Sequence, residues 1–207
     1  MVGCDRVTTL RGTGRSLSRL LLATALLGLL AGCLGGGDPM STYDLSAPSV
    51  ARAARAPRGL LVVADPTATS PFDTDRVVVR TGADQLAYLK GAQWTDRLPH
   101  LVQNRLVQTF DSARLMKSVA RPQDGLSADY RLLVDIWRFE IDAATGEATV
   151  QISTKIVADR TGRIVAGEIF EAHAPGSAAD GQAATAALDA ALSEVMSKIV
   201  AWVGAKA

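Results

Sequence analysis

Two carboxylates and two histidines are the residues of this chain that could support catalysis. Asp135 and Glu140 lie five positions apart in a segment with strand character. Successive side chains of a strand point to opposite faces, so these two are expected on different faces unless a bulge realigns them. His100 and His173 are far apart in the sequence. We therefore expect no acid–base site, and we interpret Asp135 and Glu140 as solvated strand charges and His100 as a surface residue.

Motifs of the common enzyme classes are missing from the sequence. It contains no Gly-x-x-x-x-Gly-Lys-Ser/Thr loop that would cradle a nucleotide phosphate, and no Gly-x-Ser-x-Gly nucleophile elbow. No group of histidines and cysteines has metal-ligand spacing. We expect a protein that is not an enzyme and that holds no metal and no cofactor. A hydrolase acting through Asp135 and Glu140 is the least favoured alternative.

Cys33 offers a different chemistry, because its thiol follows the features of a signal peptide. Four arginines precede an apolar run at residues 20–31, and the small residues Ala31 and Gly32 stand directly before the cysteine. A basic segment, a short apolar segment and small residues before a cleavage site are typical of secretory signals. With the cysteine in that place, the segment resembles a bacterial lipobox. We expect residues 1–32 to be a lipoprotein signal peptide and Cys33 to carry a thioether-linked lipid and an N-terminal acyl chain.

Two other interpretations of this segment stay open. Residues 20–31 could span the membrane, although a spanning helix needs about 20 apolar residues and this run is much shorter. Ordinary cleavage with Cys33 as a bystander is the second. Leu34, rather than aspartate, follows the cysteine. By the sorting rule of enteric bacteria, this favours an anchor in the outer over the inner membrane, facing the periplasm.

Composition limits the mature chain to one domain without disulfides. The precursor has 22 Lys+Arg and 21 Asp+Glu, and 18 and 20 remain after residue 32, a net charge of −2. Nucleic-acid binding requires a concentrated basic face, so we expect none. Cys4 is removed with the signal peptide, so packing alone must hold the core.

The mature chain divides into a tether and a body. Residues 33–57 are rich in Gly, Ala, Ser and Pro and are expected to form a flexible tether behind the lipidated cysteine. Tyr43, Asp44 and Leu45 are the exception, as a docking point onto the body. Residues 58–207 are expected to form a single α/β domain.

Apolar periodicity indicates the elements of that domain. Short apolar runs predict strands at residues 60–64 and 76–80, with a further short strand at 85–89. Thr95 is expected to cap a helix whose first turn holds Asp96 and Pro99. A return to the sheet follows at 115–119. Three hairpin-linked strands at 130–141, 147–158 and 163–172 predict an antiparallel meander.

The last segment, from residue 180, has helical periodicity. Its apolar stripe of Leu188, Leu192, Val195, Ile199 and Trp202 predicts a core helix on the sheet, with partner docking as the alternative. The fold class is therefore α/β, with a mixed, largely antiparallel sheet and two main helices in the order β-β-α-β-β-β-α.

The strand at 130–141 shows a break in its alternation. Tyr130, Leu132, Val134 and Ile136 share one face. Trp137, Phe139 and Ile141 fall on the other. Either both faces are covered or a bulge shifts the phase.

Several segments together resemble the ABC-type transport auxiliary lipoprotein component family, whose best-known relative is paraquat-inducible protein C. The matching residues span nearly the whole mature chain: Tyr43-Asp44-Leu45 with Pro48, 62–66, 76–80, Tyr88, 94–99, 130–132 and Phe139-Glu140. The most specific of these is Trp-Thr-Asp-Arg-Leu-Pro at 94–99, which opens the predicted helix. Trp94 is favoured as a core anchor over a contact residue.

The resemblance implies a non-catalytic, membrane-anchored accessory subunit of a lipid transport system in the cell envelope. Its implied partners are an ABC permease and ATPase and a periplasmic substrate-binding protein with MCE domains, to which it would dock while phospholipid or another lipid is passed on. Tyr88 and Arg80 are candidate partner contacts, with a strand-edge role as their alternative. A structural or assembly lipoprotein of the outer membrane, without a transport role, is the competing hypothesis.

Overall fold

The computed structural model describes residues 40–51 and 59–206. The expected signal peptide at 1–32, the lipidated Cys33 and the remainder of the expected tether lie outside the described residues. None of the helices within the described ranges is long and apolar enough to cross a membrane.

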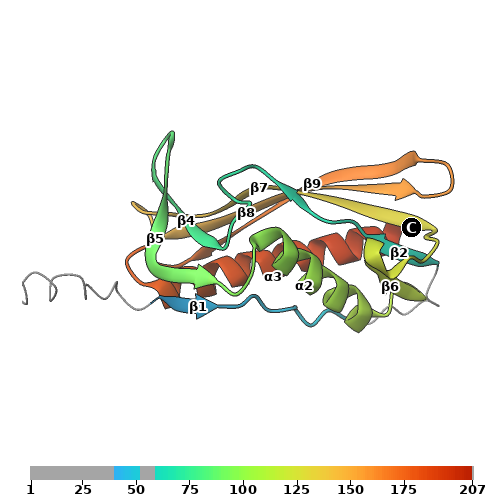
Figure 1. The fold of residues 1–207 in the computed structure, drawn as a ribbon, viewed down its shortest axis with the longest axis horizontal. Coiled ribbons are helices and arrows are strands. Elements are labelled where there is room, and N and C mark those ends of the chain that lie inside the picture. The colour runs from blue at the N-terminus through green and yellow to red at the C-terminus, as the bar shows by residue number, and fades with distance from the viewer. Residues whose placement is uncertain (1–39, 52–58, 207) are drawn as a thin grey trace, which may run out of the picture. The chain divides into compact units, whose positions relative to one another are not determined.

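A nine-stranded mixed sheet with two helices on one face forms the body (Figure 1). The strands are β1 (Ser41–Tyr43), β2 (Leu60–Val63), β3 (Thr67–Ala68), β4 (Arg76–Gly82), β5 (Gln85–Trp94), β6 (Ser118–Ala120), β7 (Tyr130–Asp142), β8 (Glu147–Ala158) and β9 (Arg163–Pro175). The helices are α2 (Leu98–Ala113) and α3 (Gly181–Lys206), and a 3₁₀ turn, η2, spans Pro122–Asp124. The α/β class and the two main helices are thus confirmed.

Strand β7 is the centre of the sheet. One of its edges pairs with β8 along almost its whole length. The other edge pairs in turn with β2, β3 and β4, all parallel to it. These three strands follow one another in the chain, so residues 60–82 run beside β7 as a strand interrupted by loops.

The expectation of a largely antiparallel sheet is wrong. Five strand pairings are parallel, namely β1–β5, β2–β6, β2–β7, β3–β7 and β4–β7. Three are antiparallel: β4–β5, β7–β8 and β8–β9. The hairpins could be predicted because short turns link antiparallel strands. The parallel pairings of β2, β3 and β4 with β7, and of β2 with β6, arise because the chain crosses through α2 between the paired strands, and such a crossover returns it in the same direction.

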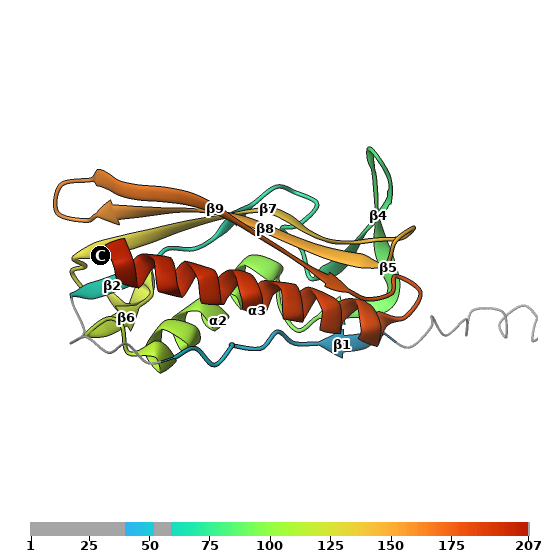
Figure 2. The same cartoon turned by 180° about the vertical axis from the view of Figure 1, so that it is seen from behind.

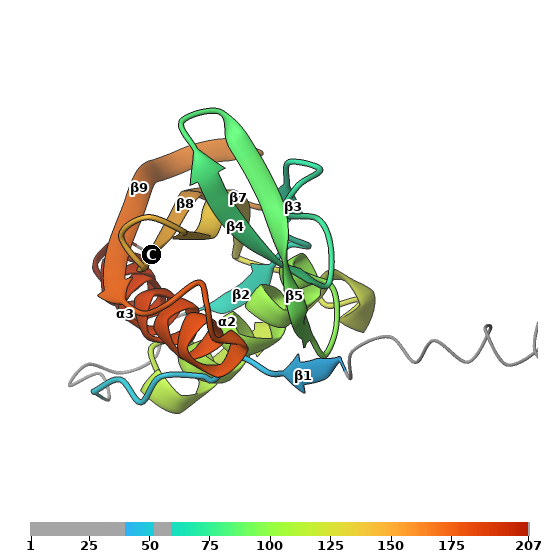
Figure 3. The ribbon, with the colours of Figure 1, turned by 90° about the vertical axis from the view of Figure 1, so that its left-hand side faces the viewer.

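Helices α2 and α3 lie side by side on one face of the sheet (Figures 1 and 2), and the strands arch over them when viewed end-on (Figure 3). The predicted stripe of α3 is buried in the core, where Leu188, Leu192, Val195 and Ile199 have no exposed surface. Phe170 of β9 packs edge-on against Trp202, with ring centroids 5.6 Å apart. The core interpretation of this helix is confirmed.

Helix α2 begins later than expected. Its N-cap is Arg97, without a side-chain capping bond, and Pro99 lies in the first turn. Thr95 is unavailable as a cap because its N–H donates to the carbonyl of Tyr43 and its hydroxyl donates to Asp44. Both bonds join the approach to α2 to the segment that contains β1.

Residues 40–51 belong to the folded body rather than to a tether. Strand β1 pairs with the end of β5, and Leu45 is buried at 3% exposure. Asp44 forms an ion pair with Arg105 of α2, and Ser46 bonds to Asp189 of α3. The docking point at residues 43–45 is confirmed, and the expectation of a flexible chain over 40–51 is wrong. The Pro and Ser content of this segment predicts a flexible chain, and it gives no sign of these few contacts with distant residues.

Trp94, at the end of β5, is a core residue, as expected. It is 2% exposed and packs edge-on against Phe139 of β7, with ring centroids 5.9 Å apart and planes at 79°. Edge-to-face packing of this kind stabilises a core beyond the area it buries. The contact joins β5 to the centre of the sheet just before α2 begins.

Candidate functional site

Most of the exposed large apolar side chains lie on the face of the sheet that points away from α2 and α3, which we call the outer face. Strand pairing fixes this placement. Val79 and Ile141 point inward to Ala184 of α3, so the alternate positions on β4, β5 and β7 point outward. The six outer-face residues are Leu86, Tyr88, Leu133, Trp137, Ile164 and Ile169, between 38% and 57% exposed. This face is therefore the candidate interaction surface of the described body.

A β-bulge at Trp137 organises this face. Ile136 pairs with Ile152 and Arg138 pairs with Gln151, which leaves Trp137 without a partner on β8. The extra residue restores the phase of β7, so that Leu132 and Ile136 before it and Phe139 and Ile141 after it are all core residues. Of the two interpretations of the broken alternation, the bulge is the observed one. It also turns the Trp137 ring outward.

The bulge places Asp135 and Glu140 on the same face but not in the same site. Asp135 accepts hydrogen bonds from the Thr67 hydroxyl at 2.8 Å and from the Trp137 indole N–H at 2.7 Å. Glu140 is engaged by Arg80 and Arg138 instead. Each carboxylate is held by its own neighbours, so the pair offers no shared acid–base geometry.

Glu140 is a buried ion-pair centre rather than the solvated charge that we expected. Its side chain is 1% exposed, and Arg80 donates from Nε and Nη2 to its two oxygens at 2.7 and 2.9 Å. Arg138 donates from Nε and Nη2 to Oε1 at 2.9 and 2.8 Å. The two guanidinium groups cover the carboxylate, and charges this deep are stable only when paired. The hydrogen bonds to Glu140 raise the pKa of Arg80 above its ordinary value.

Of the two predicted partner contacts, Tyr88 is the better exposed. Its ring is on the outer face, with the Arg76 guanidinium 5.0 Å from the ring centroid. Arg80 is 25% exposed, and its N–H groups donate to Glu140 and to the carbonyl of Ala83. We therefore keep Tyr88 as a proposed partner contact. Arg80 serves mainly to hold the buried carboxylate of Glu140.

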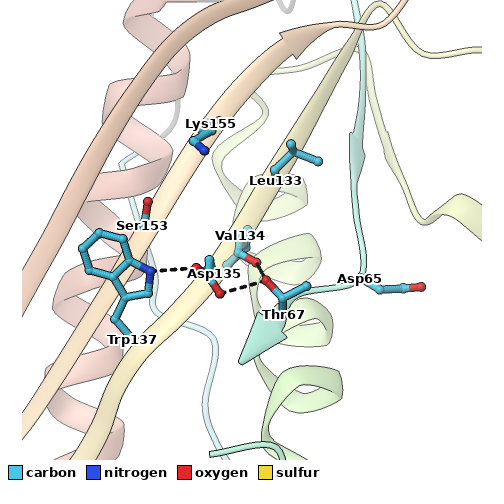
Figure 4. Close-up of a pocket in the computed structure, with 8 residues that line it drawn as sticks. All are labelled: Asp65, Thr67, Leu133, Val134, Asp135, Trp137, Ser153 and Lys155. Carbon is cyan, nitrogen blue, oxygen red and sulfur yellow. Dashed lines mark hydrogen bonds between the residues drawn. The ribbon is translucent and has the colours of Figure 1, made fainter. Parts of the chain in front are cut away.

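A hollow lies beside Trp137 on the outer face (Figure 4). Its volume is about 290 Å³, and β7 and β8 provide most of its lining. The lining residues are Asp65, Thr67, Leu133, Val134, Asp135, Trp137, Ser153 and Lys155. Asp65 is fixed from beneath by the buried Gln103, whose amide donates to its carboxylate at 2.8 Å. The hollow thus combines an aromatic wall with the positioned carboxylate of Asp135, whereas the Asp65 side chain is directed away from Asp135 (Figure 4).

A second hollow of about 310 Å³ lies against the first, between β8 and β9. It shares Ser153 and Lys155 with the first, and Gly167, Glu168 and Ile169 of β9 contribute to its lining. Gly167 pairs with Lys155 across the two strands and offers no side chain to fill the space. The two hollows therefore adjoin across three strands.

The histidines form no catalytic or metal site with each other. His100 is on the surface, as expected, with Nδ1 3.3 Å from Asp96. His173 lies on β9 between Glu171, at 2.8 Å, and Glu147, at 3.2 Å. Within residues 40–51 and 59–206 no group of three His, Cys, Asp or Glu side chains could hold a metal ion.

Sequence reasoning missed the hollow beside Trp137. Leu133, Ser153 and Lys155 are unremarkable in sequence, and Asp65 and Thr67 follow the predicted strand at 60–64 without forming a recognisable motif. One signal was present: the broken alternation of residues 130–141 implies a bulge, and bulges redirect a side chain at sheet surfaces. Residue 137, at the break, was the position to suspect.

Comparison with protein-family models identifies the family of this chain. The model of the ABC-type transport auxiliary lipoprotein component matches residues 43–200, which is most of the chain and nearly all of the described body. The chain belongs to this family. The family model describes an auxiliary lipoprotein component of ABC-type transport.

The chain is also similar to a bacterial protein and to solved structures. An uncharacterized protein of Bradyrhizobium diazoefficiens is 35% identical over 183 residues, covering 84% of this chain. The chain spans about half the length of that relative, 49%. The crystal structure of a DUF330 protein from Xanthomonas campestris is 27% identical, with a TM-score of 0.72 over 80% of this chain and 96% of its own. A second structure, 16% identical, shares the fold with a TM-score of 0.63 over 80% of this chain and 99% of its own.

Proposed function

We propose that the protein is a membrane-anchored, periplasmic accessory subunit of an ABC/MCE-type lipid transport system, and that it docks to the MCE-domain protein through its outer face. The observation that carries the proposal is the set of six exposed apolar residues on the helix-free face, Tyr88 and Trp137 among them. Aromatic residues are enriched at protein interfaces. Family membership supplies the transport context.

The anchor in this proposal is the lipidated Cys33, after removal of residues 1–32. Six residues, 34–39, separate Cys33 from Met40 at the start of the described body. An extended chain gains at most about 3.5 Å per residue, so the anchor would keep the start of β1 within about 25 Å of the membrane surface. This connection is shorter than the tether of residues 33–57 that the composition predicts. We retain the outer membrane as the favoured site of the anchor.

The role proposed for the subunit is non-catalytic. The energy for transport would come from the partner ATPase, and the permease and the MCE-domain protein would carry the lipid, which we propose to be a phospholipid. Asp135 and Glu140 support this view, because the first is tied to Thr67 and Trp137 and the second is enclosed by two arginines.

Affinity purification from membranes in mild detergent tests the proposal. We expect the tagged protein to recover an ABC permease, an ATPase and an MCE-domain protein, identified by mass spectrometry. Ile169→Glu places a charge on the outer face and should abolish this recovery. Leu126→Glu is the matched control, because Leu126 is 52% exposed but lies outside the strands of the sheet.

Two results would overturn the proposal. Recovery of envelope proteins without any transporter subunit would favour a structural or assembly lipoprotein. Equal recovery with Ile169→Glu and with Leu126→Glu would show that the outer face is not the docking surface.

A further inference from the structure

The register of β7 and β8 brings the side chains around the hollow beside Trp137 together. Ser153 on β8 pairs with Asp135 on β7, and Lys155 pairs with Leu133 one step further along. Side chains two positions apart on a strand share a face, so these four residues form one cluster on the outer face. The bulge adds the Trp137 ring to the same cluster.

The wall of this hollow is apolar and exposed. The side chain of Trp137 is 42% exposed and that of Leu133 is 38% exposed. The indole N–H of Trp137 donates to Asp135 at 2.7 Å, and this bond fixes the orientation of the ring. A ring held in this way offers a flat apolar surface and loses little freedom when a ligand binds to it.

The polar groups of the hollow include both acceptors and donors. Asp135 accepts one hydrogen bond at each oxygen, from the Thr67 hydroxyl at Oδ1 and from the Trp137 indole at Oδ2. An ionised carboxylate has about four acceptor positions, so Asp135 keeps acceptor positions for a ligand. Ser153 adds a hydroxyl, which both donates and accepts, and the Lys155 ammonium adds donors.

The charges in the hollow balance each other. Asp135 and Lys155 occupy diagonal positions of the paired strands, which lie about 7–8 Å apart in a regular sheet. Figure 4 shows Lys155 further along β8 than Asp135, and it shows Asp65 directed away from both. One carboxylate and one ammonium at this spacing give neither a cation nor an anion a net advantage. A ligand without net charge that carries both donors and acceptors fits this arrangement best.

We infer that the hollow beside Trp137 binds one ring of a neutral saccharide. The C–H groups of a sugar ring form an apolar face, which would lie against the indole of Trp137. Its hydroxyls both donate and accept, so they would donate to Asp135 and accept from Lys155. A volume of about 290 Å³ is at the lower limit of ligand pockets and suits a single ring. The inference goes beyond the proposed function, because saccharide binding requires neither a transporter subunit nor the lipid anchor.

Nuclear magnetic resonance of the full chain, in micelles of a detergent without a sugar head group, tests the inference. The chain has three tryptophans, and Trp137→Phe identifies the indole N–H signal of residue 137. The probes are glucose and N-acetylglucosamine, which are neutral, glucosamine, which is a cation, and glucuronate, which is an anion. We expect a neutral sugar to shift the Trp137 signal with a dissociation constant in the millimolar range, as suits a ligand of so few atoms. The charged sugars should bind no more tightly than the neutral ones.

Variants then locate the binding. Lys155→Met removes the ammonium but keeps the aliphatic stem, and it should weaken binding of the neutral sugar about fivefold, the scale of one hydrogen bond. Lys90→Met, at an exposed position of β5 outside the lining, should leave binding unchanged and is the matched control. The signals of Trp94 and Trp202 report whether each variant keeps its fold. A blocked dialanine peptide, which has amide groups but no hydroxyls, should not shift the Trp137 signal.

Four results would overturn the inference. These are no shift with either neutral sugar, binding of a charged sugar about tenfold tighter than that of the neutral ones, equal binding by Lys155→Met and Lys90→Met, and a dialanine shift as large as that of a sugar. The last result would indicate a site for peptide segments instead. The purification experiment stays a separate test of the proposed function, because it uses no sugar and no substitution in the lining of this hollow.

Discussion

Arg80 on β4 and Glu140 on β7 face each other across neighbouring parallel strands, with Arg80 Nε 2.7 Å and Nη2 2.9 Å from the two carboxylate oxygens. The carboxylate is buried, whereas the arginine reaches the surface. Arg138, two residues before Glu140, provides a second cation at 2.8 Å. Strand β4 is thus tied to the central strand by a charge cluster as well as by its backbone bonds.

This cluster predicts a non-additive loss of stability. Arg80→Ala or Arg138→Ala alone should lower the free energy of unfolding by about 1–2 kcal/mol, because Glu140 keeps one partner. The double variant leaves a buried carboxylate unpaired and should cost about 3–5 kcal/mol more than either single change. Urea denaturation of the four proteins measures the coupling. If the loss in the double variant equals the sum of the two single losses, the two arginines do not jointly neutralise the charge of Glu140.

Deletion of Trp137 should be tolerated by the fold, because the residue is the unpaired extra position of a bulge. Removing it leaves Ile136 and Phe139 on the core face, as they are now. We expect a loss of about 1–2 kcal/mol in the free energy of unfolding, within the range of ordinary single changes.

Deletion of Leu133 is the matched control for this prediction. Leu133 also points to the outer face but pairs regularly with Lys155. Its removal shifts one part of β7 by a single residue, which turns buried side chains outward. Thermal unfolding should show a much greater loss for this deletion than for that of Trp137. Similar losses would mean that the bulge does not absorb the change.

Asp44 predicts a pH dependence of the contact between β1 and α2. Burial of this carboxylate acts to raise its pKa, but hydrogen bonds from Arg105, Leu45 and Thr95 outweigh it and hold the pKa below the ordinary 3.8. A lowered folded-state pKa stabilises the protein above the unfolded value, and that contribution is lost as the pH falls through the folded value. Asp44→Asn should therefore destabilise at neutral pH, by less than about 1 kcal/mol because the pair is half exposed.

The test of the Asp44 prediction compares urea denaturation of the two proteins at neutral and acid pH. The difference between wild type and Asp44→Asn should shrink once the pH falls below about 4. A difference that is constant or that grows on acidification would contradict the assignment of the stabilisation to the charged carboxylate.

The proposed anchor predicts a sharp difference between the two cysteines. Cys33→Ser should release the processed body from membranes into the soluble fraction, because the lipid attachment point is gone. Cys4→Ser should stay in the membrane fraction, since residue 4 lies within the proposed signal peptide. Fractionation and immunoblotting measure both. Membrane retention of processed Cys33→Ser would contradict the lipid anchor.

Much of the body could be predicted from local pattern. Strands β7 and β8 and helix α3 were expected almost at their observed bounds, because alternation and helical periodicity arise from side chains a few residues apart. The same reasoning raised the bulge in β7 as one of two explanations. The family resemblance rested on local motifs such as residues 94–99, and the family match confirms it.

Contacts between distant segments could not be predicted in this way. The residues near Glu140 in the sequence do not indicate that Arg80, sixty residues earlier, covers its carboxylate. The prediction of a solvated charge at Glu140 was wrong for this reason. The direction of β2, β3 and β4 along β7, and the docking of residues 40–51, depend likewise on which strand edges meet after the chain has crossed through α2.

Residue type and short spacing were enough to predict the family, most of the elements and the side chains that could do chemistry. The tertiary structure alone decided how those side chains combine. It brought Asp65, Asp135, Trp137 and Lys155 into the lining of one hollow, because pairing of β3, β7 and β8 aligns positions that lie tens of residues apart. Long-range strand register, set by burial of the whole inner face, creates that arrangement.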